Sequence, residues 1–408
     1  MRPTAIDLFS GVGGMSLGFE QAGYDVVAAV ELDATHAGAH HYNFPLTEMV
    51  RSDVALLSGQ NLLEAAARGW RRHGRRGIQP AIDVVFGGPS CQGFSMIGQR
   101  RVDDERNKLV GEFARLVSEV RPRAFCLENV PGLMDRRFEA TIDEAMLRLS
   151  MSGYHLLPEP QILNAIDFGV PQIRKRVFII GTLDCEPPVI CSSSGIELTV
   201  ADAFEGLPDP RRYDSLLSSG SARLLSEDVM ARRMARGTYA RRLSGVEADP
   251  TDLSRSRVWQ RLWITNSLLT KHGVETVRRF AETKPGHVEP ISRYYRLAWD
   301  RPSRTLRAGT GSDHGSHTSP RPIHPEQHRV ITAREAARLQ SFPDWFRFNE
   351  TNWHSHRQIG NSVPPLVARA VASQLAAHLG IKPSESQTTL PRQNQGLLTT
   401  KGLFVLGD

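Results

Sequence analysis

The chain has 408 residues, 40% of them hydrophobic and 23% charged, a balance typical of a globular protein with a sizeable core. No apolar run is long enough to span a membrane and the first residues lack a signal-peptide pattern, so we expect a cytoplasmic protein without membrane contact. The net charge of +6 favours a polyanionic partner, although a solvated basic surface explains it equally well.

The four cysteines exclude two further classes of protein. Cys91, Cys126, Cys185 and Cys191 form no CxxC pair and no cluster with histidines at zinc-ligand spacing. We therefore expect neither a disulfide framework nor a metal site.

Short apolar runs alternate with helical patterns over the first 182 residues. Apolar side chains from Leu109 to Val120 recur at helical spacing between two such runs. The alternation predicts an α/β fold with a Rossmann-like, mostly parallel sheet and helices on both of its faces. The five runs expected to be strands are 4–9, 25–31, 81–88, 124–130 and 177–182.

The alternation of apolar runs and helical patterns stops between residues 183 and 300, where the sequence is irregular. Nine arginines stand against five acidic residues between positions 223 and 261. We interpret 183–300 as a smaller domain with a basic face, and an ordinary solvated surface is the alternative. Helical patterns return over 301–382, and 383–408 is expected to be a poorly ordered polar tail.

The first expected strand runs into a glycine-rich turn, DLFSGVGG. Gly11, Gly13 and Gly14 allow a tight turn, and the helix that follows offers free backbone N–H groups to a ligand. Glu31 ends the next strand, where a carboxylate can accept from both hydroxyls of a ribose. Because Ser16 stands where the GxGxxG fingerprint needs glycine, this loop alone leaves S-adenosylmethionine and NAD equally open.

Three further stretches place polar side chains at turns or strand ends. GGPSCQGFS sets Cys91 after a Pro-Ser turn, where a thiol is on its own more simply interpreted as a small core residue. CLENV places Glu128 at the end of a strand, at the same sheet edge. PQIRKR puts Arg174 and Arg176 on one side of an extended segment, and QIGNSVPP is a Gly-Asn-Ser turn heading a C-terminal helix.

Together these motifs resemble those of the C5-cytosine DNA methyltransferases of bacterial restriction-modification systems. The resemblance implies a discontinuous catalytic and cofactor-binding domain, 1–182 with 301–382, and a target recognition domain over 183–300. It also implies methyl transfer from S-adenosylmethionine to C5 of a specific cytosine that is flipped out of double-stranded DNA. The matching stretches, in the order of the family, are DLFSGVGG, ELD, GGPSCQGFS, RNKLVGEFARLV, RPRAFCLENVPGL, DFGVPQIRKRVFIIG, RTLRAG, TAREAARLQSFPD and RQIGNSVPPLVA.

The chemistry of this reaction explains the residue types. C5 of cytosine is a poor nucleophile, and a thiolate that adds to C6 makes the ring enamine-like and able to attack a methyl group. The resemblance implies that Cys91 is this nucleophile and that Glu128, with a raised pKa, protonates or hydrogen-bonds N3. It further implies that Arg176 binds the cytosine O2 and that Arg174 braces the catalytic loop.

The resemblance also implies a cofactor site and a set of DNA contacts. Phe9 would stack on the adenine, the three glycines would follow the methionine moiety, and Glu31 would bind the ribose. Asp53, at the tip of a third strand, would accept from the adenine amino group. The other implied cofactor contacts are Pro89, Leu109, Asn361 and Ser362. The implied DNA contacts are Gln92, Ser95, Met96, Gln99, Arg100, Arg101 and Thr305.

Ser90 departs from the family pattern, which commonly has proline before the cysteine. The QGFS that follows the cysteine favours DNA over tRNA, whose methylating branch usually shows a QPFT type of sequence. The retention of Cys91, Glu128 and Arg176 argues against a catalytically silent DNA-binding homologue. An NAD-dependent oxidoreductase is the alternative from another class. We expect a monomer that works beside a restriction endonuclease, and the sequence does not identify the DNA site.

Overall fold

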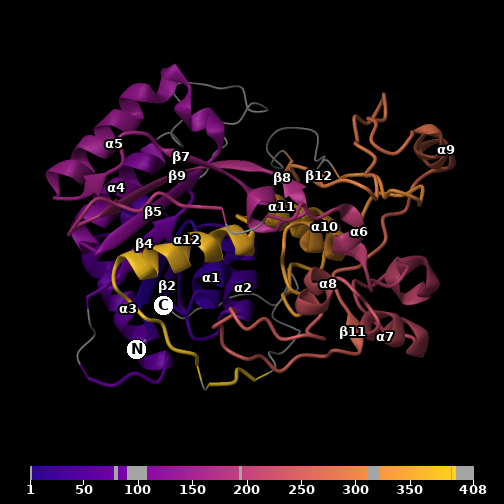
Figure 1. The fold of residues 1–408 in the computed structure, drawn as a ribbon, viewed down its shortest axis with the longest axis horizontal. Coiled ribbons are helices and arrows are strands. Elements are labelled where there is room, and N and C mark those ends of the chain that lie inside the picture. Colours follow the sequence, from indigo (N-terminus) through magenta and orange to yellow (C-terminus); the bar gives the residue numbers. More distant parts are fainter. Residues whose placement is uncertain are drawn as a thin grey trace.

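The computed structural model describes residues 2–77, 81–89, 108–192, 195–309, 321–386 and 388–391. A sheet with helices on both faces forms one lobe, and residues 195–300, called here the smaller lobe, extend from it with short helices and strands (Figure 1). Within these described residues, no helix combines the length and apolar character needed to cross a membrane.

Eight strands of the described residues form one mixed sheet, in the order β3-β2-β1-β4-β5-β9-β6, with β7 also paired to β9. The strands from β3 to β5 pair in parallel, whereas β9 runs antiparallel to its neighbours. The bounds are β1 (Thr4–Leu8), β2 (Asp25–Glu31), β3 (Glu48–Arg51), β4 (Val84–Gly87), β5 (Ala124–Asn129), β6 (His155–Leu156), β7 (Gln161–Asn164) and β9 (Lys175–Thr182).

All five predicted strands are present, and they are buried as their continuous apolar character indicates. The expected parallel pairing holds as far as β5. It does not hold at β9, because β7 and β9 follow one another without the crossover helix that parallel neighbours require.

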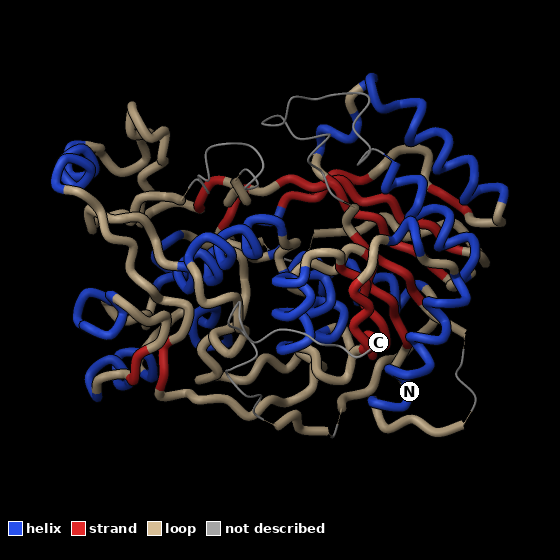
Figure 2. The backbone as a smooth tube through the Cα atoms, turned by 180° about the vertical axis from the view of Figure 1, so that it is seen from behind, coloured by secondary structure: helices blue, strands red, loops and turns tan. Residues whose placement is uncertain are grey.

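Helices cover both faces of the sheet, as the view from behind shows (Figure 2). On one face α3 (Gly59–Arg72), α4 (Lys108–Val120) and α5 (Glu139–Met151) share a core with Ile6, Leu8 and Val85. On the other face α1 (Gly14–Gln21) and α12 (Pro365–His378) share a core with Ala5 and Val84. Alternate residues of each strand thus face opposite layers, and a helix near the C-terminus packs beside the first helix.

The remaining elements connect this sheet to the smaller lobe. Helices α6 and α8 of that lobe share a core with α10 and with residues 342–348. The helices are α2 (Ala34–Asn43), α6 (Val200–Phe204), α7 (Ser226–Arg233), α8 (Thr238–Leu243), α9 (Val274–Glu282), α10 (Ala333–Leu339) and α11 (Asn352–Asn361). The short strands are β8 (Gln172–Ile173), β10 (Ala222–Arg223), β11 (Trp263–Ile264) and β12 (Ser303–Arg304).

The arginines of the smaller lobe do not all form the basic face that we expected. Arg232 and Arg255 are each 5% exposed, and several others bind acidic residues within the chain. A buried guanidinium needs hydrogen-bonding partners, and a carboxylate also balances its charge, so these side chains serve the fold. The internal pairs are Arg232–Asp344, Arg241–Glu247, Arg255–Asp25 and Arg257–Glu20.

The segment after α12, where we expected a poorly ordered polar tail, packs in part against the smaller lobe. The structure describes it as far as Pro391, and Leu390 is only 4% exposed. Leu390 forms a parallel bridge with Arg257 of the smaller lobe. One buried apolar side chain thus holds this part of the segment, and residues 392–408 lie outside the described ranges.

Candidate active site

The turn between β1 and α1 has the strained geometry of a ligand-binding loop. Phe9 has a φ of 60°, which is unfavourable for a side chain with Cβ, and Gly11 and Gly13 have φ of 54° and 96°. A Cβ atom at Gly11 would have no neighbour within 4 Å in the part of the chain that the structure describes. The half-buried ring of Phe9 packs on the core beneath the loop.

Glu31 fixes this turn from the neighbouring strand. Its Oε2 accepts a hydrogen bond of 2.8 Å from the backbone N–H of Gly11, and its Oε1 accepts one of 2.8 Å from the backbone N–H of Asp33. Each carboxylate oxygen can accept more than one hydrogen bond, so capacity for two ribose hydroxyls is left. The predicted neighbours Phe9, Gly11 and Glu31 are therefore brought together at one sheet edge.

The glycine loop also meets the chain from residue 361 to 363. A Cβ atom at Gly14 would lie 2.4 Å from the carbonyl oxygen of Val363 and 2.9 Å from Cβ of Ser362, so only glycine fits. We expected the Gly-Asn-Ser stretch to be a turn that heads a helix, but it also ends the preceding helix. Asn361 is the last residue of α11 and Ser362 is its C-cap, because Pro364 and Pro365 prevent the helix from continuing.

Three other predicted cofactor residues lie on neighbouring elements. Asp53 follows β3 and caps a short 3₁₀ helix, accepting from the N–H of Ala55 at 2.9 Å. Pro89 is buried after β4, and Leu109 is half-buried in the first turn of α4. Their elements surround the carboxyl ends of β1, β2 and β4, the edge where ligands bind in sheets of this kind.

Glu128 lies in β5 beside the chain that leads to Cys91. It is 8% exposed, and a Cβ atom at Gly88 would come within 2.7 Å of its Oε2. Glycine at that position therefore lets the chain pass directly over the carboxyl group. Burial raises the pKa of Glu128, although the guanidinium groups of Arg176 and Arg174 act in the opposite direction. The carboxyl can thus keep its proton at a higher pH than an ordinary glutamate.

The two predicted arginines have different surroundings. The Nε of Arg176 lies 3.0 Å from Oε1 of Glu128, so these two side chains form a pair at the site. Arg174 is 1% exposed and donates to the carbonyl oxygens of Leu306, Gly360 and Ser362 at 2.7–2.9 Å. In the described residues Arg174 thus joins the C-terminal segment to the sheet, and its expected role toward the catalytic loop is untested.

The nucleophile and most of the expected DNA contacts fall outside the described residues. Pro89 is the last described residue before them, and the side-chain amide of Asn129 donates to its carbonyl oxygen at 3.1 Å. Thr305 is exposed and donates to the carbonyl oxygen of Ile173 at 2.8 Å. The expected residues that cannot be placed are Cys91, Gln92, Ser95, Met96, Gln99, Arg100 and Arg101.

A buried polar network beneath the glycine loop was missed by the sequence analysis. Ser16 donates to Oδ2 of Asp7 at 2.6 Å, and the Nε2 of His40 lies 3.0 Å from the Ser16 oxygen. Burial raises the pKa of Asp7 and lowers that of His40 to about 3. The glycine fingerprint marks Ser16 only as a missing glycine. The signal for its role in this network was a polar residue on an otherwise apolar helix face.

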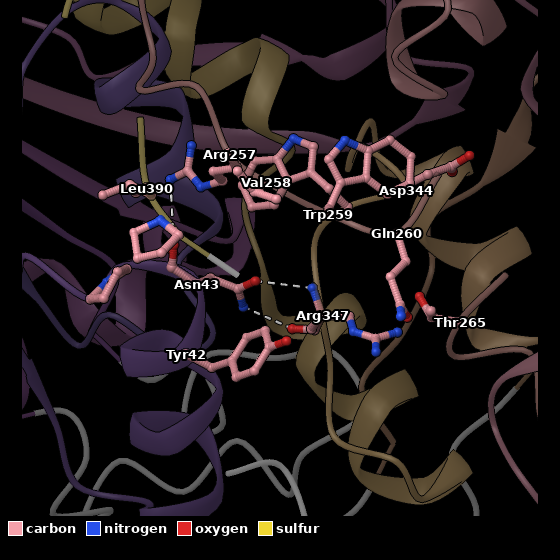
Figure 3. A pocket seen from close by; sticks show the side chains of 13 residues that line it. Tyr42, Asn43, Arg257, Val258, Trp259, Gln260, Thr265, Asp344, Arg347 and Leu390 are labelled. Atoms are coloured by element: carbon pink, nitrogen blue, oxygen red, sulfur yellow. Dashed lines mark hydrogen bonds between the residues drawn. The ribbon is translucent and has the colours of Figure 1, made fainter. Parts of the chain in front are cut away.

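A pocket of about 600 Å³ lies away from these residues, between the end of α2, the smaller lobe and the chain near Trp345 (Figure 3). None of the described residues predicted for the active site lines it. Across the ranges that the structure covers, no group of three or more His, Cys, Asp or Glu side chains could hold a metal ion.

Comparison with known proteins gives a family match over most of the chain. Residues 4–377 match the C-5 cytosine-specific DNA methylases. The chain is 44% identical to the type II methyltransferase M.XorII of Xanthomonas oryzae pv. oryzae, over 97% of this chain and 90% of that protein. It is 33% identical to M1.HphI of Haemophilus parahaemolyticus, over 91% of this chain and 86% of that protein.

Solved structures similar to this chain include methyltransferases. A protein described as a DNA modification methyltransferase encoded within a prophage (E. coli) is 35% identical, with a TM-score of 0.74 over 93% of this chain and 99% of that chain. The S. pombe Dnmt2 methyltransferase, 16% identical with a TM-score of 0.56 over 93% and 100%, shares the fold. The predicted fold class and family are confirmed, and of the two enzyme classes left open, the match selects the methyltransferase.

Proposed function

Because the chain belongs to the C-5 cytosine-specific DNA methylases and is a type II DNA cytosine-5 methyltransferase, we propose that the site described above carries out the transfer. The observation that supports this most directly is the buried pair of Glu128 and Arg176, which lies against Gly88, three residues before Cys91. The site would act on a cytosine flipped out of the duplex, since a stacked base cannot present C6 to a thiolate.

We propose that S-adenosylmethionine, the methyl donor of the family, binds at the carboxyl ends of β1, β2 and β3. When bound, it supplies an electrophilic methyl group. The open space beside Gly11 and the remaining acceptor capacity of Glu31 fit its methionine and ribose parts. Phe9 would stack on the adenine, and Asp53 would accept from the amino group with the oxygen that does not cap the 3₁₀ helix.

The chain's own residues would divide the chemistry between them. The thiolate of Cys91 would add to C6 of the cytosine and so make C5 electron-rich enough to take the methyl group that the cofactor would supply. Glu128 would give or share a proton at N3, a role that its raised pKa favours. Arg176 would donate to O2 while it remains paired with Glu128, and loss of the C5 proton would release the cysteine.

The decisive experiment uses a duplex that contains 5-fluorocytosine at the target position. Fluorine cannot leave as a proton does, so the adduct with Cys91 should persist and survive denaturing electrophoresis. Methyl-labelled S-adenosylmethionine should label ordinary DNA with the wild-type protein and not with Cys91→Ser. Label transfer by Cys91→Ser, or an active enzyme that forms no adduct, would overturn the mechanism.

We also propose that the protein works as a monomer and protects DNA from a restriction endonuclease that recognises the same site. The type II methyltransferases to which it is similar support the second part. Bisulfite sequencing after expression in a methylation-free host should reveal one methylated sequence. A molar mass of twice 45.3 kDa under assay conditions would contradict the monomer.

A further inference from the structure

The smaller lobe reaches back to the sheet through residues 249–258, called here the strap. The strap follows α8 and precedes β11, so both of its ends lead into the smaller lobe. Arg255 of the strap donates to Oδ1 of Asp25 at 2.8 Å, and Arg257 donates to Oε2 of Glu20 at 2.6 Å. Asp25 begins β2 and Glu20 lies in α1, and Arg369 of α12 donates to Asp249 of the strap at 2.7 Å, so the strap is bonded to the sheet lobe by three charged pairs.

Arg2 connects the strap to a third segment, the residues 383–386 and 388–391, called here the tail. Its guanidinium donates to Asp25, to the carbonyl oxygen of Leu253 at 2.6 Å and to that of Ser384 at 3.1 Å. Arg2 is 3% exposed, and a charge so deeply buried needs all of these partners. One buried side chain thus holds sheet, strap and tail together.

The tail also binds the strap directly. The Arg255 side chain donates to Oγ of Ser386 at 2.8 Å. The backbone of Leu390 accepts from Val258 at 3.0 Å and donates to Ser256 at 2.7 Å, as in a short parallel pair of strands. In Figure 1 the tail runs from α12 below the sheet toward the smaller lobe. The tail is therefore bonded to the strap through both its backbone and its side chains.

Beyond Arg257 the chain lines a pocket. Val258, Trp259 and Gln260 border the open pocket of about 600 Å³, with Trp345 and Tyr42 among its other lining residues (Figure 3). The strap is therefore attached by its charged pairs, by the bonds made by the tail, and by hydrogen bonds of Gln21 in α1 with Asp252 and Leu253.

We propose that the strap and the tail form a latch that fixes the angle of the smaller lobe, and thereby positions DNA over the active site. This inference rests on the proposed function and on the target recognition expected of residues 183–300, by which one duplex would meet both the smaller lobe and the site of Cys91. The latch contacts Asp25, the first residue of β2, whereas the proposed ribose contact Glu31 is the last. These two residues are the ends of a seven-residue strand and lie about 20 Å apart, so loosening the latch should leave cofactor binding unchanged.

The test compares Leu390→Asp with Thr389→Asp in the full-length chain. Both add one carboxylate to the tail, but Leu390 is buried and Thr389 is exposed. Leu390→Asp should raise the KM for DNA roughly five- to thirtyfold, with the KM for S-adenosylmethionine and kcat at saturating DNA unchanged. Thr389→Asp should match the wild type. Ser386→Ala, which removes one bond to Arg255, should give a smaller rise in the same parameter.

Hydrogen exchange gives a readout that does not depend on methyl transfer. The amides of residues 253–258 should exchange faster in Leu390→Asp, and those of β1 and β4 should not. An unchanged KM for DNA with faster exchange in the strap would overturn the positioning role. Equal increases in both KM values would also overturn it, since they indicate a general loss of structure. Failure of the wild-type protein to label DNA would instead refute the proposed function.

Discussion

The carboxyl group of Glu128 is buried at the carboxyl end of β5, with Arg176 at 3.0 Å. Burial raises its pKa, so the folded protein binds the proton more tightly than the unfolded chain does. The stability that comes from this preference is fully present below the unfolded pKa of about 4.3, and it is lost as the pH rises through the raised value. The same property suits Glu128 to the proposed role of proton donor and lowers the stability of the fold at neutral pH.

Glu128→Gln should separate these two effects. Glutamine does not ionise, so the variant should melt at a higher temperature than the wild type at pH 8, and the difference should shrink toward pH 4. Its kcat should fall by about 10²- to 10⁴-fold, because no proton can be given to N3. Thermal melts across this pH range and methyl-transfer rates at pH 8 test both parts. A difference in melting temperature that does not vary with pH would contradict the account.

Phe9 adopts a left-handed backbone conformation that few residues with a Cβ atom adopt, at a φ of 60°. Such strain is kept where the surrounding structure and a function require it. Phe9→Leu keeps the apolar contact with the core but removes the stacking surface. The KM for S-adenosylmethionine should rise about three- to tenfold with little change in kcat, since aromatic contacts contribute about 0.5–1.5 kcal/mol. Phe19→Leu, in the core of the opposite face, should lower stability without that change in KM.

Among the elements, α1 depends most closely on a partner distant in the sequence. A Cβ atom at Gly18 would lie 2.4 Å from Cβ of Ala368, so glycine permits the close packing of α1 and α12. A Cβ atom at Gly111, in α4, would have no neighbour within 4 Å among the described residues. The same amino acid in two helices is thus required by packing in one and only tolerated in the other.

The substitution of these two glycines by alanine should therefore have opposite effects. Gly18→Ala should destabilise the protein by about 1–3 kcal/mol, because α12 must move away. Gly111→Ala should stabilise it by about 0.5–1 kcal/mol through the better helix propensity of alanine. Urea unfolding of both variants measures this. Equal signs for the two changes would show that packing against α12 does not decide the effect.

The strands were predictable because continuous apolar runs form only where both faces of a sheet are covered, and β1, β2, β4 and β5 have that pattern. Glu128 and Glu31 were predictable because they end such strands. The partners of Arg255 were not predictable, since Asp25 lies 230 positions away and a sequence does not specify which distant carboxylate a guanidinium meets. Leu390 was missed for a similar reason, because one apolar residue in a polar segment gives no periodic signal.

For the whole molecule, the net charge of +6 does not measure the charge available to DNA. Arg232, Arg255 and Arg257 are bound to carboxylates inside the protein, and Arg2, Arg75 and Arg255 share the one carboxylate of Asp25. Arginines held in these internal ion pairs stabilise the junction of the lobes. The charges that bind phosphate must come from arginines and lysines without such internal partners.

The salt dependence of DNA binding distinguishes these two groups of arginines. Each phosphate contact that is removed should reduce the slope of log K against log salt by about 0.9. Arg100→Gln, at an expected DNA contact, should lower the slope by this amount. Arg241→Gln should not, because Arg241 already binds Glu247 at 2.8 Å and carbonyl oxygens of the smaller lobe. Titrations between 50 and 200 mM salt provide the comparison. An equal fall in slope for both variants would mean that the arginines of the smaller lobe contact phosphate despite their internal partners. That result would support the basic face expected from the sequence.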